Sequence, residues 1–330
     1  MGWWSEDELA GDDGWLPAGL NNGWAYRDQV AEPWGSVAAF YASRYPHSAL
    51  QVWHQRLARG DISRNGEPLW GDAPLRGGDR LVWRRPPWWE DAVPAAWPVV
   101  HDDGDLLVID KPAGLPVLPA GGWLEHTVLR LLERRHQKDS AGVPRPVHRL
   151  GRFTSGLLVC ARQGATRRWL SARLRESTAA QGESHLREAP CSKVYRALVA
   201  PGGVPGAMAP GEALTIQTPI GRRPHPRLGR IWCATSGDQP GDLAARSTLT
   251  LLERGPQGDR VAVGIASGRP HQIRIHCAAI GAPLVGDPLY VAGGGARPEA
   301  LPGDGGYQLR AQALAIQRPD GSWLRLDLEA

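Results

Sequence analysis

Apolar positions early in the chain repeat with the spacing of short amphipathic helices. Leu50, Trp53 and Leu57 lie at i, i+3 and i+7, so residues 49–58 are predicted to form a helix that stops at Gly60. Three further elements are predicted nearby: a helix that includes Val37, Phe40 and Tyr41, a hairpin turn at Asn65–Gly66, and a strand at Arg80–Trp83. This pattern indicates a small α/β unit.

The longer region that follows has the pattern of a sheet. Short apolar or alternating runs occur at 105–110, 156–161, 193–199, 248–252, 260–265 and 323–328. Residues 272–276 also alternate, which predicts a strand with Gln272, Arg274 and His276 on one face. An amphipathic helix is predicted at Thr127–Arg135. Because strands outnumber helices and hairpins are indicated, the expected fold class is α+β, with a mixed, largely antiparallel sheet and flanking helices.

The composition is that of a globular chain with a modest basic excess. The 330 residues are 42% hydrophobic and 22% charged, and the formal net charge is +4. Arginine greatly outnumbers lysine, and the forked guanidinium suits phosphates and base edges. Genomic base composition explains the arginine bias equally well, so charge alone does not identify a partner.

Cysteine spacing and hydropathy exclude several classes of protein. The four cysteines are widely scattered and form no C-x-x-C pair, which disfavours a zinc site, a redox motif or a disulfide framework. The first residues lack a basic region followed by an apolar run, and no apolar stretch approaches the length of a membrane span. We therefore expect a soluble, cytoplasmic protein without membrane association.

Four segments, in a fixed order, carry a resemblance to a known family. They are DKPAGLPV at 110–117, HRLGRFTSGLLV at 148–159, SKVYRALV at 192–199, and GRPHQIRIH at 268–276, which continues to GAPLVGD at 281–287. These resemble the KPAG turn, the HRLD-x-x-TSG loop, the K-x-Y-x-A strand and the GR-x-HQ-[IL]-R-x-H block of the RluA-like RNA pseudouridine synthases. The resemblance covers residues 99 to about 328 and implies the pseudouridine synthase fold.

The N-terminal unit resembles an S4-like RNA-binding module. The module's R-x-x-x-G-x-I-x-x-NG…GD skeleton matches Arg56, Gly60, Ile62, Asn65, Gly66, Gly78 and Asp79. We therefore expect an irregular N-terminal arm at 1–25, an S4-like module at 26–90 and a pseudouridine synthase catalytic-type domain at 91–330.

The resemblance implies that the chain isomerises uridine in RNA. Uracil is detached from C1′ of the ribose, rotated and rejoined through C5, and this chemistry needs no cofactor and no metal. The target base must be flipped from its stack, and Arg149 is expected to hold the gap that it leaves. Tyr195 matches the tyrosine that lies against the uracil, and Arg274 matches the arginine that pairs with the catalytic carboxylate.

The same motifs supply the residues expected to contact RNA. They are Lys111, His148, Arg149, Arg152, Thr154, Arg269 and Gln272. Lys111 has two interpretations, a phosphate contact or a solvated turn residue. His271 and His276 are expected to point to opposite faces of a strand and to form hydrogen bonds, so no metal site is predicted. Asp287 is expected to bond loop amides.

One position departs from the family pattern, because Gly151 stands where the family has its essential aspartate. The loop is otherwise in register through Thr154, Ser155 and Gly156. Three interpretations are open. Another carboxylate reaches the pocket, the chain binds RNA without isomerising uridine, or a different residue performs related chemistry. If the site is otherwise competent, Gly151→Asp is expected to create or raise pseudouridine formation.

The favoured function is therefore an RNA pseudouridine synthase that acts on rRNA or tRNA. An S4-like module is more usual in the rRNA-directed branch, so rRNA is the preferred partner. The alternative is a catalytically silent RNA-binding homologue. A hydrolase is disfavoured, since no nucleophile–base–acid order or metal spacing supports it. A monomer is expected.

Overall fold

The computed structural model describes residues 14–176, 191–265 and 268–328. Backbone contacts divide the chain into two compact units. The larger unit contains residues 14–17, 92–176, 191–223, 231–265 and 268–328, and the smaller contains residues 18–91 and 224–230. No helix within the described ranges is long and apolar enough to cross a membrane.

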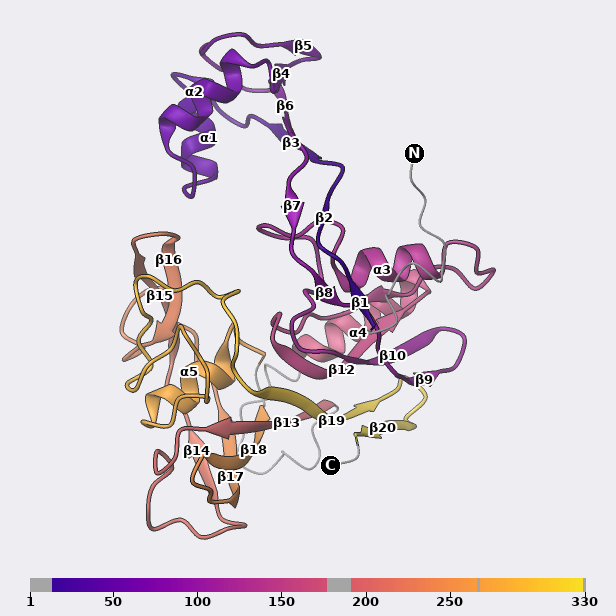
Figure 1. Ribbon diagram of the computed structural model, residues 1–330, viewed down its shortest axis with the longest axis vertical. Coiled ribbons are helices and arrows are strands. Elements are labelled where there is room, and N and C mark those ends of the chain that lie inside the picture. Colours follow the sequence, from indigo (N-terminus) through magenta and orange to yellow (C-terminus); the bar gives the residue numbers. More distant parts are fainter. Residues whose placement is uncertain (1–13, 177–190, 266–267, 329–330) are drawn as a thin grey trace. The chain divides into compact units, whose positions relative to one another are not determined.

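The smaller unit packs two helices against a four-stranded antiparallel sheet (Figure 1). The strand order is β3 (Trp24–Gln29), β6 (Arg80–Arg85), β4 (Ile62–Arg64) and β5 (Glu67–Pro68), and the helices are α1 (Val37–Arg44) and α2 (Leu50–Ala58). Trp53 and Leu57, one turn apart on α2, are fully buried, and the Trp53 ring lies 4.8 Å from that of Trp83. Both predicted helices and the Asn65–Gly66 turn are confirmed.

Strand pairing extends β6 and reaches into the region where an N-terminal arm was expected. β6 continues to Arg85 because its last residues pair with the start of β3. Residues before β3 also pair with residues after β6, in two short antiparallel pairs. β1 (Trp15–Leu16) pairs with β8 (Val93–Pro94) in the larger unit, and β2 (Gly19–Leu20) pairs with β7 (Trp89–Glu90) in the smaller unit. Residues 14–25 thus contain strands where an irregular arm was expected, and the rest of that arm, residues 1–13, lies outside the described residues.

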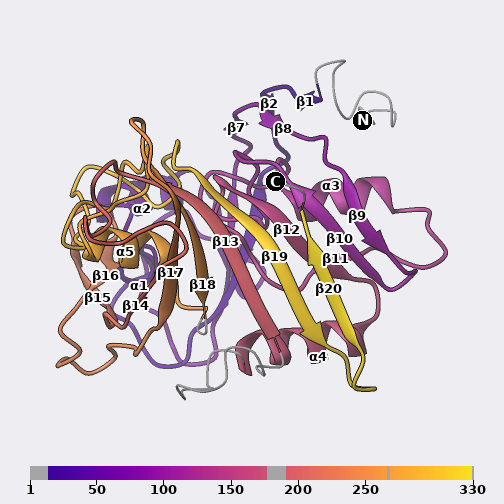
Figure 2. The same cartoon turned by 90° about the horizontal axis from the view of Figure 1, so that it is seen from below.

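The larger unit is built on a ten-stranded sheet (Figure 2). Eight strands follow one path: β14 (Ala213–Ile216), β17 (Ser247–Glu253), β18 (Asp259–Ile265), β13 (Cys191–Val199), β19 (Leu309–Gln317), β12 (Thr154–Ala161), β10 (Leu106–Lys111) and β9 (Val99–Asp102). β11 (Arg145–Pro146) pairs with β12, and β20 (Trp323–Asp327) pairs with β19. All pairs are antiparallel except β12–β19. The α+β class with a mixed, largely antiparallel sheet is confirmed.

The larger unit also contains three helices and most of a hairpin, whose tip, residues 224–230, is part of the smaller unit. They are α3 (Val128–Arg135), α4 (Gly164–Glu176), α5 (Gln272–Ala279) and the hairpin of β15 (Ile220–His225) and β16 (Gly229–Ala234). Thr127 caps α3, since its Oγ1 accepts a hydrogen bond from the backbone N–H of Arg130. The helix predicted at Thr127–Arg135 is thereby confirmed.

Two hydrophobic clusters form the core of this unit. One joins α3 and α4 to β10 and β12, and the other joins α5 to β13, β17 and β18. Ala197 and Val199 on β13 and Val261 and Val263 on β18 are buried in the cluster of α5, and the residues between them are more exposed. β19 contributes Leu309 to one cluster and Ala311 to the other, so this central strand links the two halves.

Residues 272–276 form the first part of helix α5, and the strand predicted there is wrong. Alternation misled because Gln272–Ala278 are all buried, so the segment has no solvent-facing stripe to reveal the helical period. Gln272 and His276, at i and i+4, share a helix face and both bond the hydroxyl of Ser247. Gly281, at φ 88°, follows the helix as a stop signal.

Candidate functional site

Neighbouring strands bring the motif segments together. Tyr195 of β13 lies opposite Ala311 of β19, and Ala311 lies opposite Gly156 of β12. Two residues further along, Ala197, Leu309 and Thr154 are joined in the same way, and the row between them joins Arg196, Arg310 and Ser155. The loop 148–153 leads directly into Thr154, so it meets the sheet two residues before the row that contains Tyr195.

Tyr195 lies where the two hydrophobic clusters meet. It packs against both of them and is partly buried. Burial, with a smaller effect of Cys191, raises the pKa of the phenol to about 12. The phenol is therefore neutral at physiological pH and offers a ring face and an O–H donor.

Arg274, on α5, is held by a carboxylate of its own unit. Its Nε and Nη2 donate to the two oxygens of Asp287, at 2.7 Å each, and Nη1 donates to the carbonyl of Pro302 at 3.2 Å. Both side chains are almost completely buried, at 4% and 0% exposed. Burial lowers the pKa of Arg274, but the hydrogen bonds and charge of Asp287 outweigh it and raise that pKa. The guanidinium is thus neutralised without any group at residue 151.

Asp287 has no free capacity as a nucleophile or base. In addition to Arg274, its Oδ1 accepts the backbone N–H groups of Leu289 and Tyr290, at 2.9 and 3.2 Å. The expected bonds to loop amides are therefore present. The pairing with Arg274 adds a structural role that the sequence did not indicate.

The space beside Gly151 is occupied by Tyr307. A Cβ atom on Gly151 would collide with the Tyr307 hydroxyl, and it would lie 3.1 Å from Oγ1 of Thr154 and 3.7 Å from Cζ of Tyr307. The φ angle of Gly151 is outside the left-handed region, so the backbone itself would accept a side chain. The neighbouring tyrosine, and not chain conformation, therefore requires glycine at this position.

Tyr307 also connects the Gly151 loop with Arg274. The Arg274 guanidinium lies 4.2 Å from the centroid of the Tyr307 ring, and the Tyr307 hydroxyl lies 3.4 Å from Oγ1 of Thr154. The ring of Phe153 meets it edge-on at 6.1 Å. Tyr307 is only 4% exposed. The structure thus brings Gly151, Thr154 and Arg274 around one residue that sequence reasoning missed.

The loop residues expected to contact RNA differ in exposure. Arg149 is exposed, and its positive charge is near enough to His271 to contribute to the lowered pKa of that ring. Arg269 is half-buried, with its Nε bonded to the carbonyl of Ala244. Arg152 donates from Nε to the carbonyl of Gly114 and stacks on Trp123 at 4.3 Å. Of the three arginines, Arg149 is the most available for a ligand.

His148 serves the backbone of its own unit. Its Nε2 accepts the N–H of Val159 at 3.1 Å, which requires an unprotonated nitrogen. Burial, together with the charge of Lys193, lowers the pKa of the ring to about 3. These contacts give half-buried His148 a structural position that orients the loop, and Thr154 is buried.

The expectations for Lys111 and Gln272 need correction, because both side chains are buried and bonded internally. Nζ of Lys111 donates to the carbonyls of Pro112, Leu115 and Arg152, at 2.7, 2.8 and 3.1 Å. Lys111 is 0% exposed, so it is neither a phosphate contact nor a solvated turn residue. Gln272 donates to the carbonyl of Arg246 and to Ser247 and is 3% exposed, so its amide is a structural group.

His271 and His276 are also structural. His276 bonds Oγ of Ser247 at 2.8 Å and the carbonyl of Thr218 at 2.9 Å, and burial lowers its pKa to about 4. His271 precedes α5 with φ 56° and bonds the Tyr290 hydroxyl at 2.7 Å. In the described part of the chain no group of three or more His, Cys, Asp or Glu side chains is placed to hold a metal ion.

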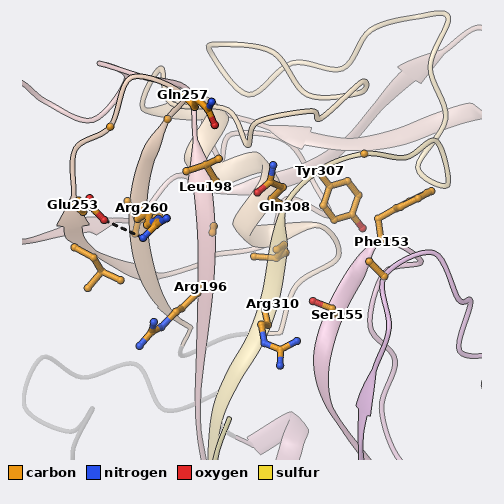
Figure 3. Close-up of a pocket in the computed structure, with 18 of the residues that line it drawn as sticks. Phe153, Ser155, Arg196, Leu198, Glu253, Gln257, Arg260, Tyr307, Gln308 and Arg310 are labelled. Atoms are coloured by element: carbon orange, nitrogen blue, oxygen red, sulfur yellow. Dashed lines mark hydrogen bonds and ion pairs between the residues drawn. The ribbon is translucent and has the colours of Figure 1, made fainter. Parts of the chain in front are cut away.

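A hollow of about 900 Å³ opens beside Phe153 and Tyr307 on the larger unit (Figure 3). Strands β13, β18 and β19, the turn between β17 and β18, and the start of β12 line it. Gly151, Tyr195 and Arg274 are not among its lining residues. The hollow therefore meets the candidate site only at the end marked by Phe153 and Tyr307.

Comparison with known proteins relates this chain to enzymes that modify RNA. Residues 105–279 match the family of RNA pseudouridylate synthases. An uncharacterized RNA pseudouridine synthase of Synechocystis is 41% identical over 280 residues, covering 84% of this chain and 87% of that protein. RNA pseudouridine synthase 5 of Arabidopsis thaliana is 36% identical over 339 residues, covering 90% of this chain and 89% of that protein.

Two further comparisons concern a bacterial relative and a solved structure. Ribosomal large subunit pseudouridine synthase D of Pseudomonas aeruginosa is 37% identical over 194 residues, covering 58% of this chain and 52% of that protein. Human RNA pseudouridylate synthase domain containing 4 has a similar fold, with a TM-score of 0.50 and 19% identity over 70% of this chain and 87% of that one.

Proposed function

Because this chain belongs to the RluA-like family of RNA pseudouridylate synthases, we propose that it converts a specific uridine of a cellular RNA into pseudouridine. The bond from C1′ to N1 of uracil breaks, the base rotates, and a bond from C1′ to C5 forms while the C5 proton leaves and N1 takes up a proton. No atom is gained or lost overall, so the reaction needs no redox partner.

The observation that carries this proposal is the convergence of the motif residues at one end of the central strands. Tyr195 lies in the row of Gly156, two residues along the sheet from Thr154, and Tyr307 joins Gly151 and Thr154 to Arg274. In this arrangement Tyr195 supplies a ring face for the extruded uracil. Exposed Arg149 supplies a guanidinium that fills the gap in the RNA.

Neither Gly151 nor Asp287 supplies the acid–base group that the reaction needs. Gly151 has no side chain, and the four hydrogen bonds to Asp287 leave that carboxylate structural. Activity in the wild type would therefore require a carboxylate from another part of the chain or a different group. Removal of a nucleophile ordinarily costs many orders of magnitude in rate.

The test is to map pseudouridine in total RNA from cells with and without this protein. The enzyme should account for one or more defined sites, which are lost on deletion and restored by the purified chain acting on that RNA. We prefer a site in rRNA to one in tRNA and expect the chain to act as a cytoplasmic monomer. An identical pseudouridine map in both strains would reject synthase activity.

A catalytically silent RNA-binding homologue is the second candidate. It is favoured by one observation, that the Tyr307 hydroxyl fills the space beside Gly151 while Arg274 is already neutralised. This candidate predicts salt-sensitive RNA binding with no modified base. Binding by the purified protein, measured beside the pseudouridine map, separates the two functions.

We propose that the smaller unit is an S4-like module that binds the same RNA. Residues that match the S4 skeleton stabilise the turn at Asn65–Gly66. The Asn65 side chain donates to Asp79 at 2.8 Å and accepts the N–H of Arg80 at 2.9 Å. Arg56 stacks between Trp53 and Trp83, at 4.1 and 4.3 Å from their rings.

Replacing the exposed Arg76 and Arg80 by glutamine in the full chain should weaken rRNA binding and leave thermal stability unchanged. Unchanged affinity would contradict the assignment.

A further inference from the structure

The open face of the sheet in the larger unit carries a basic hollow that the proposed reaction does not use. On β13, Tyr195, Ala197 and Val199 alternate toward α5, so Arg196 and Leu198 point to the opposite face. Figure 3 shows Arg196, Leu198, Arg260 and Arg310 along the hollow on that face. The feature is thus distinct from the surroundings of Tyr195 and Arg274.

Three arginines on adjacent strands give this hollow its charge. Arg196 lies directly opposite Arg310 on β19, and Arg260 lies opposite Leu198 on β18. Like charges directly opposite each other destabilise a sheet. Arginines placed this way therefore favour an anion that binds between them.

Their partners inside the protein neutralise only part of that charge. Arg310 pairs with Asp110 at 2.8 Å, and Arg260 pairs with Glu253 at 3.1 Å, where both side chains are more than half exposed and solvent weakens the pair. Arg196 is exposed, and its side chain has no hydrogen bond or ion pair with another described residue. Glu253 is the sole carboxylate among the described residues that line the hollow.

The rest of the lining suits nucleotides. Ser155, Gln257 and Gln308 provide neutral hydrogen-bonding groups, and Leu198 and Leu252 provide an apolar surface. Phe153, which is half-buried, presents an aromatic ring at the end nearest the Gly151 loop. Bases of single-stranded RNA stack on such rings, while guanidinium groups follow the phosphates.

Building on the proposed function, we propose that this hollow binds a single-stranded segment of the RNA substrate that flanks the target uridine. Arg196 and Arg260 contact successive phosphates, and Phe153 stacks on a base. Because Phe153 and Tyr307 adjoin the Gly151 loop, a strand held here reaches the candidate site from the open face of the sheet. The sheet thus contributes both of its faces to the RNA.

The experiment measures binding of a single-stranded uridine oligonucleotide by the full chain over a range of salt concentrations. Arg196→Gln and Arg260→Gln together should weaken binding roughly tenfold and reduce the slope of log K against log salt by about 0.7 for each charge removed. Arg325→Gln, an exposed arginine on β20, is the matched control and should change both quantities less. An effect of the double variant no larger than that of two such controls would overturn the proposal.

Two further measurements test whether the hollow binds single-stranded RNA in preference to other polyanions. Poly-glutamate of equal charge should displace the oligonucleotide poorly, and a duplex of equal length should lose less affinity in the double variant. If poly-glutamate competes as well as RNA, or if the duplex loses as much affinity, the hollow is not a single-strand site. Thermal melting of Arg196→Gln should show a midpoint at or above that of the wild type, because the substitution removes a like-charge pair.

These outcomes are independent of turnover. A wild type that makes no pseudouridine but loses oligonucleotide binding in the double variant would reject the proposed function and support the RNA site. If the wild type modifies RNA and the double variant binds the oligonucleotide like the control, the proposed function is supported and the RNA site in the hollow is rejected.

Discussion

The Tyr307 hydroxyl occupies the position that a Cβ atom on Gly151 would need. The two residues are far apart in sequence, and the strand pairing of β12 with β19 brings them together. The identity of residue 151 and the presence of a hydroxyl at residue 307 are therefore coupled. This coupling gives the glycine a physical reason that lies outside its own loop.

The coupling can be measured as stability. Gly151→Ala should lower the free energy of unfolding by about 1–3 kcal/mol, because the methyl group overlaps the Tyr307 hydroxyl. Tyr307→Phe removes only a 3.4 Å contact with Thr154 and should cost much less. In the double variant the methyl group would lie 3.7 Å from Cζ, an ordinary contact, so most of the loss should disappear.

Urea denaturation of the wild type, both single variants and the double variant yields the interaction free energy directly. Additive single effects would show that the two side chains do not compete for this space.

The same relationship changes the expectation for Gly151→Asp. Alone, the aspartate should produce little pseudouridine, because its Cβ displaces Tyr307 and disturbs the ring under Arg274. Combined with Tyr307→Phe, the carboxylate fits beside Thr154, and pseudouridine formation should rise at least tenfold above that of the single variant. Mass spectrometry of RNA incubated with each variant measures this difference. Equal activity of the single and double variants would show that the tyrosine does not obstruct the carboxylate.

Lys111 is expected to matter for stability and not for RNA affinity. Lys111→Met leaves three carbonyl groups without their buried donor, which should cost about 2–4 kcal/mol. Lys138→Met, at an exposed position, should change stability by less than about 0.5 kcal/mol. Denaturation gives the first comparison, and RNA titration at a temperature where both variants are folded gives the second. A large loss of affinity specific to Lys111→Met would restore the phosphate-contact interpretation.

Three histidines with lowered pKa values predict acid sensitivity. Burial lowers the pKa of His148 to about 3 and the pKa values of His271 and His276 to about 4, whereas an unfolded histidine titrates near 6.5. The unfolded chain therefore binds more protons in this range, so stability is complete above pH 6.5 and falls as the pH drops toward 4. The slope approaches about 1.4 kcal/mol per pH unit for each histidine.

Unfolding free energies measured from pH 7 to pH 4.5 check this prediction. His148→Gln should reduce the slope by about one proton relative to the wild type. A slope that is the same in both proteins would mean that His148 is protonated in the folded state.

Sequence reasoning worked where a pattern is local. The helices α1, α2 and α3 and the Asn65–Gly66 turn were predicted because caps, stops and apolar spacing lie within a few residues of one another. It failed at α5 and omitted β19. The β19 segment LRAQALAIQ is rich in residues that favour helices, yet it pairs with β13, β12 and β20 as the central strand.

The sequence by itself determined the motif order and the α+β class, since these are properties of residue type and spacing. The tertiary structure alone decided that the Tyr307 hydroxyl fills the space beside Gly151, that Asp287 holds Arg274, and that Lys111 is buried. The physical reason is the same in each case. Contacts between residues distant along the chain depend on strand pairing and packing, which leave no periodic trace in the sequence.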